Sequence, residues 1–233
     1  IGDLVRAESQ DVLQANHTLS GIDIAMWDLL GRRYEEPVYK LLGYERAEPR
    51  QPYASVLFGD TAQDTLVKAR GIREKGYLAA KFGWGPYGKG SVDDDRAQVE
   101  AAREGLGPDG ILLVDVGTIW GHDLAAAEAR LPALQAVNAT WLEEPFVSGA
   151  LHAYHALAQQ SGSVRIAGGE GAHNEDMARQ MIDQGGLGFV QIDAGRIGGI
   201  SPSHLGARVW GYPGLATGAP AAPIRAPGAA RGG

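Results

Sequence analysis

The sequence predicts an α/β protein built on a parallel sheet, and one repeating pattern carries this prediction. Short runs rich in Val, Ile, Leu and aromatic residues recur along the first 211 residues, and a helical pattern follows each run. Strands that alternate with helices are typical of βαβ units, whose strands run parallel. We expect six strands, over residues 53–58, 78–82, 111–115, 140–144, 164–168 and 189–193.

A helix is expected before the first strand, over residues 18–31. Its apolar residues recur at helical spacing and share one face. These residues are Ile22, Ala25, Met26, Leu29 and Leu30. Ser20 and Asp23 are interpreted as the start signal of this helix. The helix is expected to pack against the sheet or barrel as a separate element.

Two of the later helices carry clear start signals. Thr61 with Asp64, and Ser91 with Asp94, have the spacing of a hydroxyl and an acid three residues apart. At this spacing each side chain can satisfy a free backbone N–H group at the first turn. We therefore expect helices to begin just after Thr61 and Ser91.

The segment 212–233 has a different composition from the rest of the chain. Of its 22 residues, 16 are Ala, Gly or Pro, and no apolar period continues through it. Such a segment buries too little apolar surface to offset the entropy of ordering it. We interpret it as an aberrant Ala/Gly/Pro-rich tail that follows the folded body.

Composition excludes several classes of function. With 21 Lys and Arg against 28 Asp and Glu, the net charge is −7, which argues against nucleic-acid binding. The absence of Cys excludes disulfides, thiolate metal sites and a Cys nucleophile. No apolar run approaches 18 residues, and no leader pattern is visible, so we expect no membrane span and a cytoplasmic location.

Acidic residues recur at or just beyond the ends of the third to sixth expected strands. They are Asp115, the pair Glu143 and Glu144, Glu170 and Asp193, and Lys81 stands near the end of the second strand. From Lys81 to Asp193 the spacing is 34, 28, 27 and 23 residues, about one βα unit each time. Interiors of parallel barrels favour Val, Ile and Leu at strand positions, so this acidic series calls for another explanation.

A divalent cation is the explanation that we favour. Carboxylates brought together at one rim repel each other unless a cation neutralises them. Mg²⁺ prefers such sparse carboxylate sites, and we predict that Asp115, Glu143 and Glu170 hold it. Any one of these acids could instead be the N-cap of a following helix. Because side chains alternate along a strand, only one of Glu143 and Glu144 can face the site, and spacing alone does not decide which.

Several motifs resemble the enolase superfamily, in its branch of mandelate racemase type, over residues 17–203. The motifs are Gly21-Ile-Asp-Ile-Ala-Met-Trp-Asp-Leu-Leu-Gly31, Pro37-Val-Tyr-Lys-Leu-Leu-Gly43, Asp115-x-Gly117, Trp141-Leu-Glu-Glu-Pro145, Gly168-Gly-Glu170 and Asp193-x4-Gly198-Gly199. The resemblance implies a modified TIM barrel, incomplete here at about six βα units. Residues 1–48 would be the helical remnant of an α+β capping domain, and residues 49–211 a partial catalytic barrel.

The resemblance also implies a reaction. Mg²⁺ held by Asp115, Glu143 and Glu170 would stabilise the intermediate formed when a proton α to a carboxylate is removed. Lys81 matches a family lysine that binds the substrate carboxylate or stabilises charge, although Phe82-Gly83 follows in place of the family's second lysine. Trp84 and His173 are further candidates for substrate binding.

Asp193 is the remaining catalytic candidate. It matches an acid that pairs, in this branch, with a histidine from the seventh strand to form a general base. One further unit predicts that strand near residue 220, where the sequence reads Thr217-Gly-Ala-Pro-Ala-Ala222 and has no histidine.

The expected activity is dehydration of a sugar acid to a 2-keto-3-deoxy acid by a Mg²⁺-dependent lyase. The alternatives are a catalytically inactive fragment and a racemase or cycloisomerase on the same scaffold. The expected partner is a small carboxylate substrate, and the full-length protein is expected to form a homo-oligomer.

Overall fold

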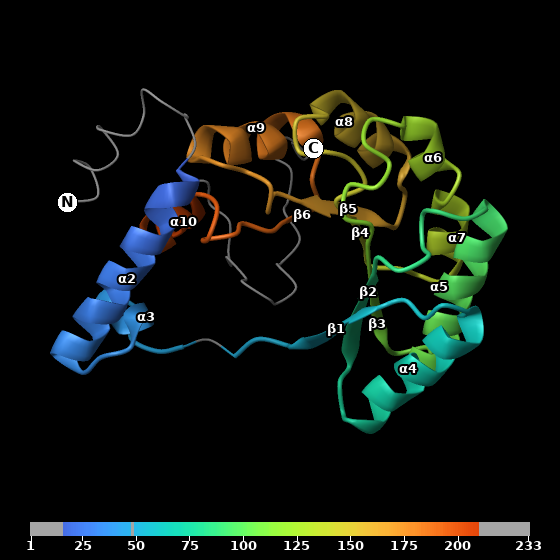
Figure 1. Ribbon diagram of the computed structural model, residues 1–233, viewed down its shortest axis with the longest axis horizontal. Helices are drawn as coiled ribbons and strands as arrows, with labels where there is room; N and C mark the ends of the chain where they lie inside the picture. The colour runs from blue at the N-terminus through green and yellow to red at the C-terminus, as the bar shows by residue number, and fades with distance from the viewer. Residues whose placement is uncertain (1–15, 48, 210–233) are drawn as a thin grey trace, which may run out of the picture.

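A computed structural model describes residues 16–47 and 49–209 (Figure 1). The predicted tail at 212–233 lies outside the described residues. Six strands form one parallel sheet in chain order: β1 (Tyr53–Leu57), β2 (Ala79–Gly83), β3 (Ile111–Asp115), β4 (Trp141–Glu143), β5 (Arg165–Gly168) and β6 (Phe189–Val190). The six predicted strands are therefore confirmed, although β6 is shorter than expected. Beyond β6, the N–H of Gln191 still donates a hydrogen bond to the Gly168 carbonyl of β5, and the chain then turns at Asp193.

Helices precede β1, connect the strands and follow β6. They are α2 (His17–Tyr34), α3 (Val38–Leu41), α4 (Ala62–Glu74), α5 (Val92–Leu106), α6 (Leu124–Glu128), α7 (Leu131–Ala136), α8 (Leu151–Gln160), α9 (Glu175–Gly185) and α10 (Ile200–Val209). Figure 1 shows α4 to α9 in an arc along the outside of the sheet. Parallel strands in chain order, each followed by a helix, are the arrangement of a βα barrel, of which six units are described.

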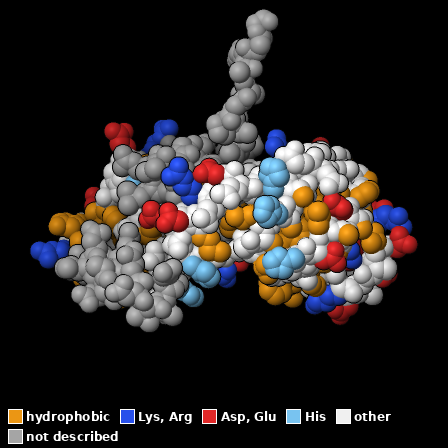
Figure 2. Space-filling model, turned by 90° about the horizontal axis from the view of Figure 1, so that it is seen from above, with side chains coloured by type: hydrophobic (Ala, Val, Ile, Leu, Met, Phe, Trp, Pro, Cys, Tyr) orange, Lys and Arg blue, Asp and Glu red, His pale blue; other side chains and the backbone are white. Residues whose placement is uncertain are grey.

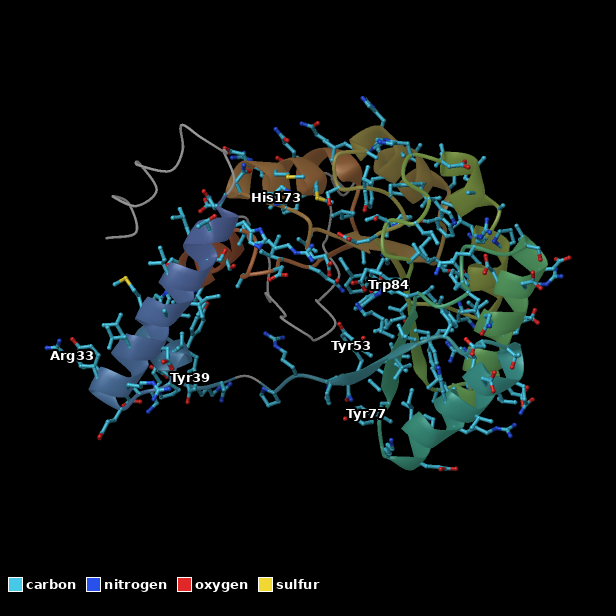
Figure 3. All side chains as sticks on the ribbon, in the orientation of Figure 1. Arg33, Tyr39, Tyr53, Tyr77, Trp84 and His173 are labelled. Carbon is cyan, nitrogen blue, oxygen red and sulfur yellow. The ribbon has the colours of Figure 1, made fainter. Side chains whose placement is uncertain are left out.

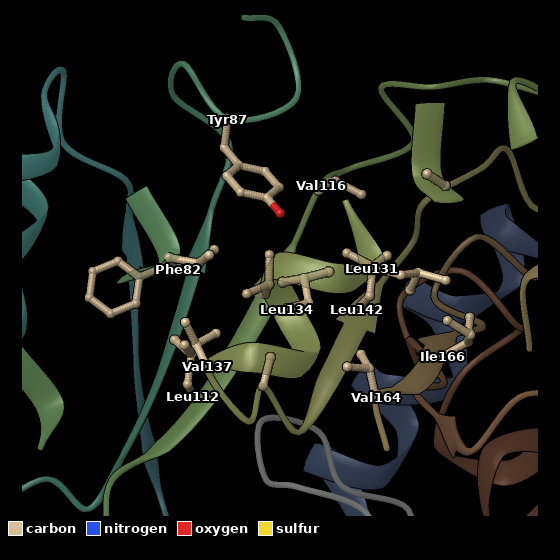
Figure 4. Close-up of a cluster of buried hydrophobic side chains, with 14 of the residues drawn as sticks. Phe82, Tyr87, Leu112, Val116, Leu131, Leu134, Val137, Leu142, Val164 and Ile166 are labelled. Atoms are coloured by element: carbon tan, nitrogen blue, oxygen red, sulfur yellow. The ribbon is translucent and has the colours of Figure 1, made fainter. Parts of the chain in front are cut away.

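The two faces of the sheet bury different sets of side chains. Alternation along β3 sends Leu112 and Val114 to the helix side, where they join a large apolar cluster (Figure 4). Leu113 points the other way and packs with Trp141 and Phe189 inside the curve of the sheet. This period of two is what places charged residues at the inner rim, because the residue two positions after an inner core residue faces inward as well.

The start signals of α4 and α5 are confirmed, but that of α2 is wrong. Thr61 with Asp64, and Ser91 with Asp94, form complete capping boxes. Helix α2 instead begins at His17 after Asn16, three residues before Ser20. Ser20 and Asp23 lie within the helix, where their side chains accept hydrogen bonds from Gly198 and Ser201 of a distant segment.

The predicted apolar face of α2 is only partly covered. Ile22 is 46% exposed, Leu29 is 61% exposed and Ala25 is exposed as well, while Met26 and Leu30 are half-buried. The buried residues of the helix are Leu19 and Ser20, which lie outside the predicted face. Seen from above, hydrophobic side chains lie at the surface in several places among acidic and basic ones (Figure 2). Among the helices within 16–47 and 49–209, none has the length and apolar character needed to cross a bilayer.

Candidate active site

The parallel register brings two of the predicted metal ligands side by side. Asp115 is the last residue of β3 and Glu143 the last residue of β4, and the two are direct partners in the sheet. Each stands two residues after an inner core residue, Leu113 or Trp141. Both carboxylates therefore face the inside of the curve at the carboxyl ends of the strands, which is the edge where barrel proteins carry their active sites.

Lys81 of β2 lies between these two carboxylates. Its Nζ is 2.9 Å from Asp115 Oδ2 and 2.8 Å from Glu143 Oε1. Glu143 is fully buried, and its second oxygen accepts a hydrogen bond of 3.2 Å from Nε2 of Gln191. The Lys81 ammonium also lies 5.8 Å from the centre of the Tyr53 ring, within reach of a cation–π interaction.

The charge states of this trio follow from burial and from mutual contact. Burial raises the pKa of Glu143 to about 7, with the Asp115 carboxylate acting in the same direction and Lys81 against it. Burial alone would lower the pKa of Lys81, but Glu143 and Asp115 outweigh it and hold the pKa above its ordinary value. Lys81 is therefore an ammonium ion at neutral pH, which suits charge stabilisation and not proton removal.

Glu143, and not Glu144, is the member of the pair that faces the inner rim. Glu144 follows the end of β4 with a positive φ of 44° and is nearly fully buried. Within the described part of the chain, its Oε1 has no hydrogen-bond partner. Burial raises the pKa of Glu144 to about 7, and the nearby charges of Glu170 and Glu143 add to this.

The third predicted ligand, Glu170, is directed toward a different cation. Its Oε1 lies 3.4 Å from Arg196, whose Nε is also 3.4 Å from Asp193 Oδ2. All three side chains are about 40% exposed, so this is a half-solvated cluster. Asp193 Oδ1 accepts a hydrogen bond of 2.6 Å from the N–H of Gly195, which fixes the turn after β6.

The donor chemistry at this rim suits a divalent cation. Among the residues that the structure describes, no three acids or histidines converge closely enough to form a ready metal site. Asp115 and Glu143 nevertheless already converge on one cationic atom, Lys81 Nζ, and all the donors are carboxylate oxygens. Mg²⁺ prefers such hard oxygen ligands. The donor types present therefore fit the ion, but Lys81 Nζ would have to leave the position between Asp115 and Glu143, and Glu170 its contact with Arg196, for the three carboxylates to share it.

Of the three predicted substrate-binding residues, Trp84 and His173 lie apart from each other (Figure 3). Trp84 is 58% exposed and lines a pocket of about 220 Å³ together with Lys81 and Asp115. Its ring lies over Gly117, where a Cβ would come within 2.7 Å of the indole. His173 is exposed and lies toward α2 and α9, where its carbonyl accepts a hydrogen bond of 3.0 Å from the N–H of Asn16.

Sequence reasoning did not identify Gln191, Arg196 and Tyr53 as neighbours of the acidic residues. Gln191 lies two positions after Phe189, so the alternation that located Asp115 and Glu143 could also have indicated it. Arg196 lies in a turn, where side chains follow neither the alternation of a strand nor the repeat of a helix. Its contact with Glu170 joins two separate loops. Tyr53 lies on β1 at the level of the inner core, below the charged rim.

The fold and the rim define a βα-barrel protein with a carboxylate cluster at the carboxyl ends of its strands. The chain belongs to the enolase superfamily: residues 64–210 match the family described as Enolase C-terminal domain-like, and residues 1–43 match the N-terminal domain of the mandelate racemase and muconate lactonizing enzymes. The predicted family and the modified TIM-barrel fold are thereby confirmed.

Relatives of known name perform several related reactions; they include sugar-acid dehydratases, cycloisomerases and a racemase. The L-talarate/galactarate dehydratase of Salmonella typhimurium is 34% identical over 81% of this chain and 46% of its own length. The chain thus spans about half the length of the curated relatives it matches.

Two solved structures are also similar. A predicted mandelate racemase from Rhodobacter sphaeroides shares 57% identity at a TM-score of 0.82, over 89% of this chain and 53% of that one. An enolase from Bradyrhizobium, solved with magnesium and mandelic acid, shares 27% identity at a TM-score of 0.79, over 90% and 56%.

Proposed function

We propose that the protein containing this chain removes the proton α to the carboxylate of a sugar acid, with Mg²⁺ bound at the rim, and dehydrates the acid to a 2-keto-3-deoxy acid. The observation that supports this most is the convergence of Asp115 and Glu143, from adjacent strand ends, on one cationic position. The dehydratases among the relatives support the choice of sugar acids.

Asp115, Glu143 and Glu170 are proposed to hold Mg²⁺. When bound, the ion would supply positive charge against the carboxylate oxygens of the substrate, where negative charge grows as the α-proton leaves. Lys81 is already an ammonium ion and lies beside two of these ligands. We assign it to binding the substrate carboxylate, with its Nζ donating hydrogen bonds to an oxygen.

The remaining predicted residues take positions around the substrate. Trp84, which lines the same pocket as Lys81, would cover one face of a small polar acid. Asp193 is proposed to take part in moving the α-proton, and His173 to contact the distal end of the substrate. The overall chemistry is balanced: the α-carbon loses a proton, the β-carbon loses hydroxide, the two leave as water, and the resulting enol becomes the 2-keto acid.

Racemisation and cycloisomerisation begin with the same proton abstraction, and relatives of both kinds exist. The protein would therefore be incubated with a panel of aldonic and aldaric acids and Mg²⁺ in D₂O. Formation of a 2-keto acid supports dehydration. Deuterium at the α-carbon without a keto product would overturn dehydration and favour a racemase, and neither signal with any acid would indicate an inactive fragment.

Two variants identify the site in this assay. Glu143→Gln removes a proposed ligand charge and Lys81→Met removes the proposed carboxylate-binding cation, so both are expected to abolish formation of the 2-keto acid. Asp109→Asn is the matched control, because Asp109 is exposed on the turn before β3. The expected homo-oligomer and cytoplasmic location stay predictions from the sequence, to be tested by light scattering and cell fractionation.

A further inference from the structure

The first half of helix α2 contacts two loops of the acidic rim that lie more than 150 residues away in sequence. The N–H of Asn16 donates to the carbonyl of His173, in the loop that follows Glu170. The hydroxyl of Ser20, which is buried, accepts a hydrogen bond of 3.0 Å from the N–H of Gly198. Figure 1 shows α10 beside this part of α2.

Asp23 makes the closest of these contacts, at the start of α10. Its Oδ2 accepts a hydrogen bond of 3.0 Å from the N–H of Ser201, and its Oδ1 accepts one of 2.5 Å from the Ser201 hydroxyl. Nε1 of Trp27, one turn further along α2, donates to the same hydroxyl at 3.0 Å. A carboxylate that accepts a first-turn N–H is the interaction that an N-cap residue makes, here supplied from 178 residues away.

The residues at the start of α10 provide no N-cap side chain of their own. Gly199, just before the helix, has no side chain with which to cap it, and a Cβ there would collide with the Asp23 carboxylate. Pro202 has no N–H group, so Ser201 carries one of the few free donors of the first turn. The carbonyl of Gly199 accepts hydrogen bonds from both the N–H and the hydroxyl of Ser203, which fixes the opposite side of the turn.

A short rigid segment connects this cap to the site. The carbonyl of Asp193 accepts hydrogen bonds from the N–H groups of Arg196 and Ile197, at 3.0 and 3.1 Å. Ile197 is fully buried, and Arg196 contacts both Glu170 and Asp193. Segment 193–199 therefore joins the start of α10 directly to Arg196 and Asp193.

We propose that Asp23 is a positioning residue that caps α10 across the boundary between the N-terminal helix and the barrel, and thereby fixes segment 193–199 at the site. The motif Gly21-Ile-Asp23 and the pair Gly198-Gly199 then form the two halves of one contact. The role of Asp23 in positioning the site rests on the proposed function. The contact between Asp23 and α10 can be tested without metal or substrate.

Hydrogen exchange followed by mass spectrometry tests this proposal on the whole chain. Asp23→Ala is expected to speed exchange in peptides covering 193–203 by about 2- to 30-fold, the range that loss of an N-cap produces. Peptides covering β1 to β3 should not change. Asp23→Asn keeps an oxygen that can accept the Ser201 N–H, so it should restore exchange close to that of the parent protein.

Asp28→Ala is the matched control, because Asp28 lies on the same helix but pairs only with Arg32 at the surface in the described structure. Equal exchange in 193–203 for Asp23→Ala and the parent protein would overturn the proposal, as would the same acceleration in Asp28→Ala. If Asp23→Ala does not fold, Ser201→Ala removes the hydroxyl side of the contact. It should speed exchange in the same peptides, and unchanged exchange there would equally refute the contact.

Activity provides a second readout that a merely structural role would not change in this way. Once turnover of a sugar acid is found, Asp23→Ala should lower kcat by more than it raises KM, because segment 193–199 carries Asp193 and not the pocket around Lys81. Asp23→Asn should restore kcat. A rise in KM with unchanged kcat would contradict positioning through this segment while leaving the dehydration itself established.

Discussion

The buried ion pair between Asp95 and Arg130 gives a stability prediction that can be worked out in detail. Asp95 Oδ2 accepts a hydrogen bond of 2.7 Å from Arg130 Nε, and both side chains are less than a tenth exposed. The other Asp95 oxygen accepts the N–H of Gly88 at 2.8 Å. The pair therefore ties α5 to the loop after β2 and to the residue that precedes α7.

The perturbation is Asp95→Asn, which keeps the shape of the side chain but removes its charge. Arg130 would then be a buried cation without its counter-charge, although an amide oxygen at position 95 can still accept its Nε–H and its bonds to the carbonyls of Ala126 and Gly90 and its contact with the Trp120 ring remain. Removing one partner of a buried pair costs about 3–5 kcal/mol. Because three of these Arg130 contacts remain, we expect about 3 kcal/mol, at the lower end of that range.

Urea unfolding followed by circular dichroism measures this cost. The matched control is the pair Asp93 and Arg96 on the same helix, whose side chains are 79% and 52% exposed. Asp93→Asn, which removes the charge of that exposed pair, should lower the free energy of unfolding by less than about 1 kcal/mol. If Asp95→Asn lowers the free energy of unfolding no more than Asp93→Asn does, the buried pair does not stabilise the fold by more than the exposed pair.

The remaining predictions concern local structure. Thr61→Ala should destabilise the protein by about 1 kcal/mol in urea, as loss of an N-cap does, whereas a change below a few tenths would show that the box does not form. The Thr61 hydroxyl holds the pKa of Asp64 below its ordinary value. The stability from this contact is therefore present above the unfolded pKa and lost as the pH falls through the folded pKa; NMR titration should show the pKa of Asp64 rising in Thr61→Ala. Gly105→Ala should destabilise by about 1–3 kcal/mol through overpacking, because its Cβ would lie 2.5 Å from that of Ala69 on α4. Gly71→Ala, with open space around its Cβ, should stabilise by roughly 0.4–1 kcal/mol, and equal effects of the two glycine changes would contradict the packing described.

Much of the barrel could be predicted from sequence because its strands follow one repeated rule. Inner and outer residues alternate along β3 and β4, so Asp115 and one of the pair Glu143 and Glu144 could be placed at one rim from their positions alone. The choice between Glu143 and Glu144 needed the register, since only the inner core residue Trp141 shows which parity faces inward.

The contacts between distant segments could not be predicted in this way. Ser20 and Asp23 have the spacing of a helix start signal, yet they contact Gly198 and Ser201. A hydroxyl and an acid three residues apart can cap their own helix or can contact a distant segment. The local sequence is the same for both, so only the tertiary structure shows which contact forms. The contact of Glu170 with Arg196 is of the same kind, because both residues lie in irregular loops without a period.

The proposed chemistry depends on Asp115, Glu143 and Glu170 sharing one Mg²⁺ ion, and isothermal titration calorimetry can measure whether they do. We expect one saturable site per chain, weakened at least tenfold by Glu143→Gln and by Glu170→Gln, since outer-shell changes alone commonly cost 10- to 100-fold. Asp109→Asn should leave it unchanged. A chain that binds no Mg²⁺ after removal of bound metal with a chelator, or that binds it equally well without Glu143 and Glu170, would contradict the shared site.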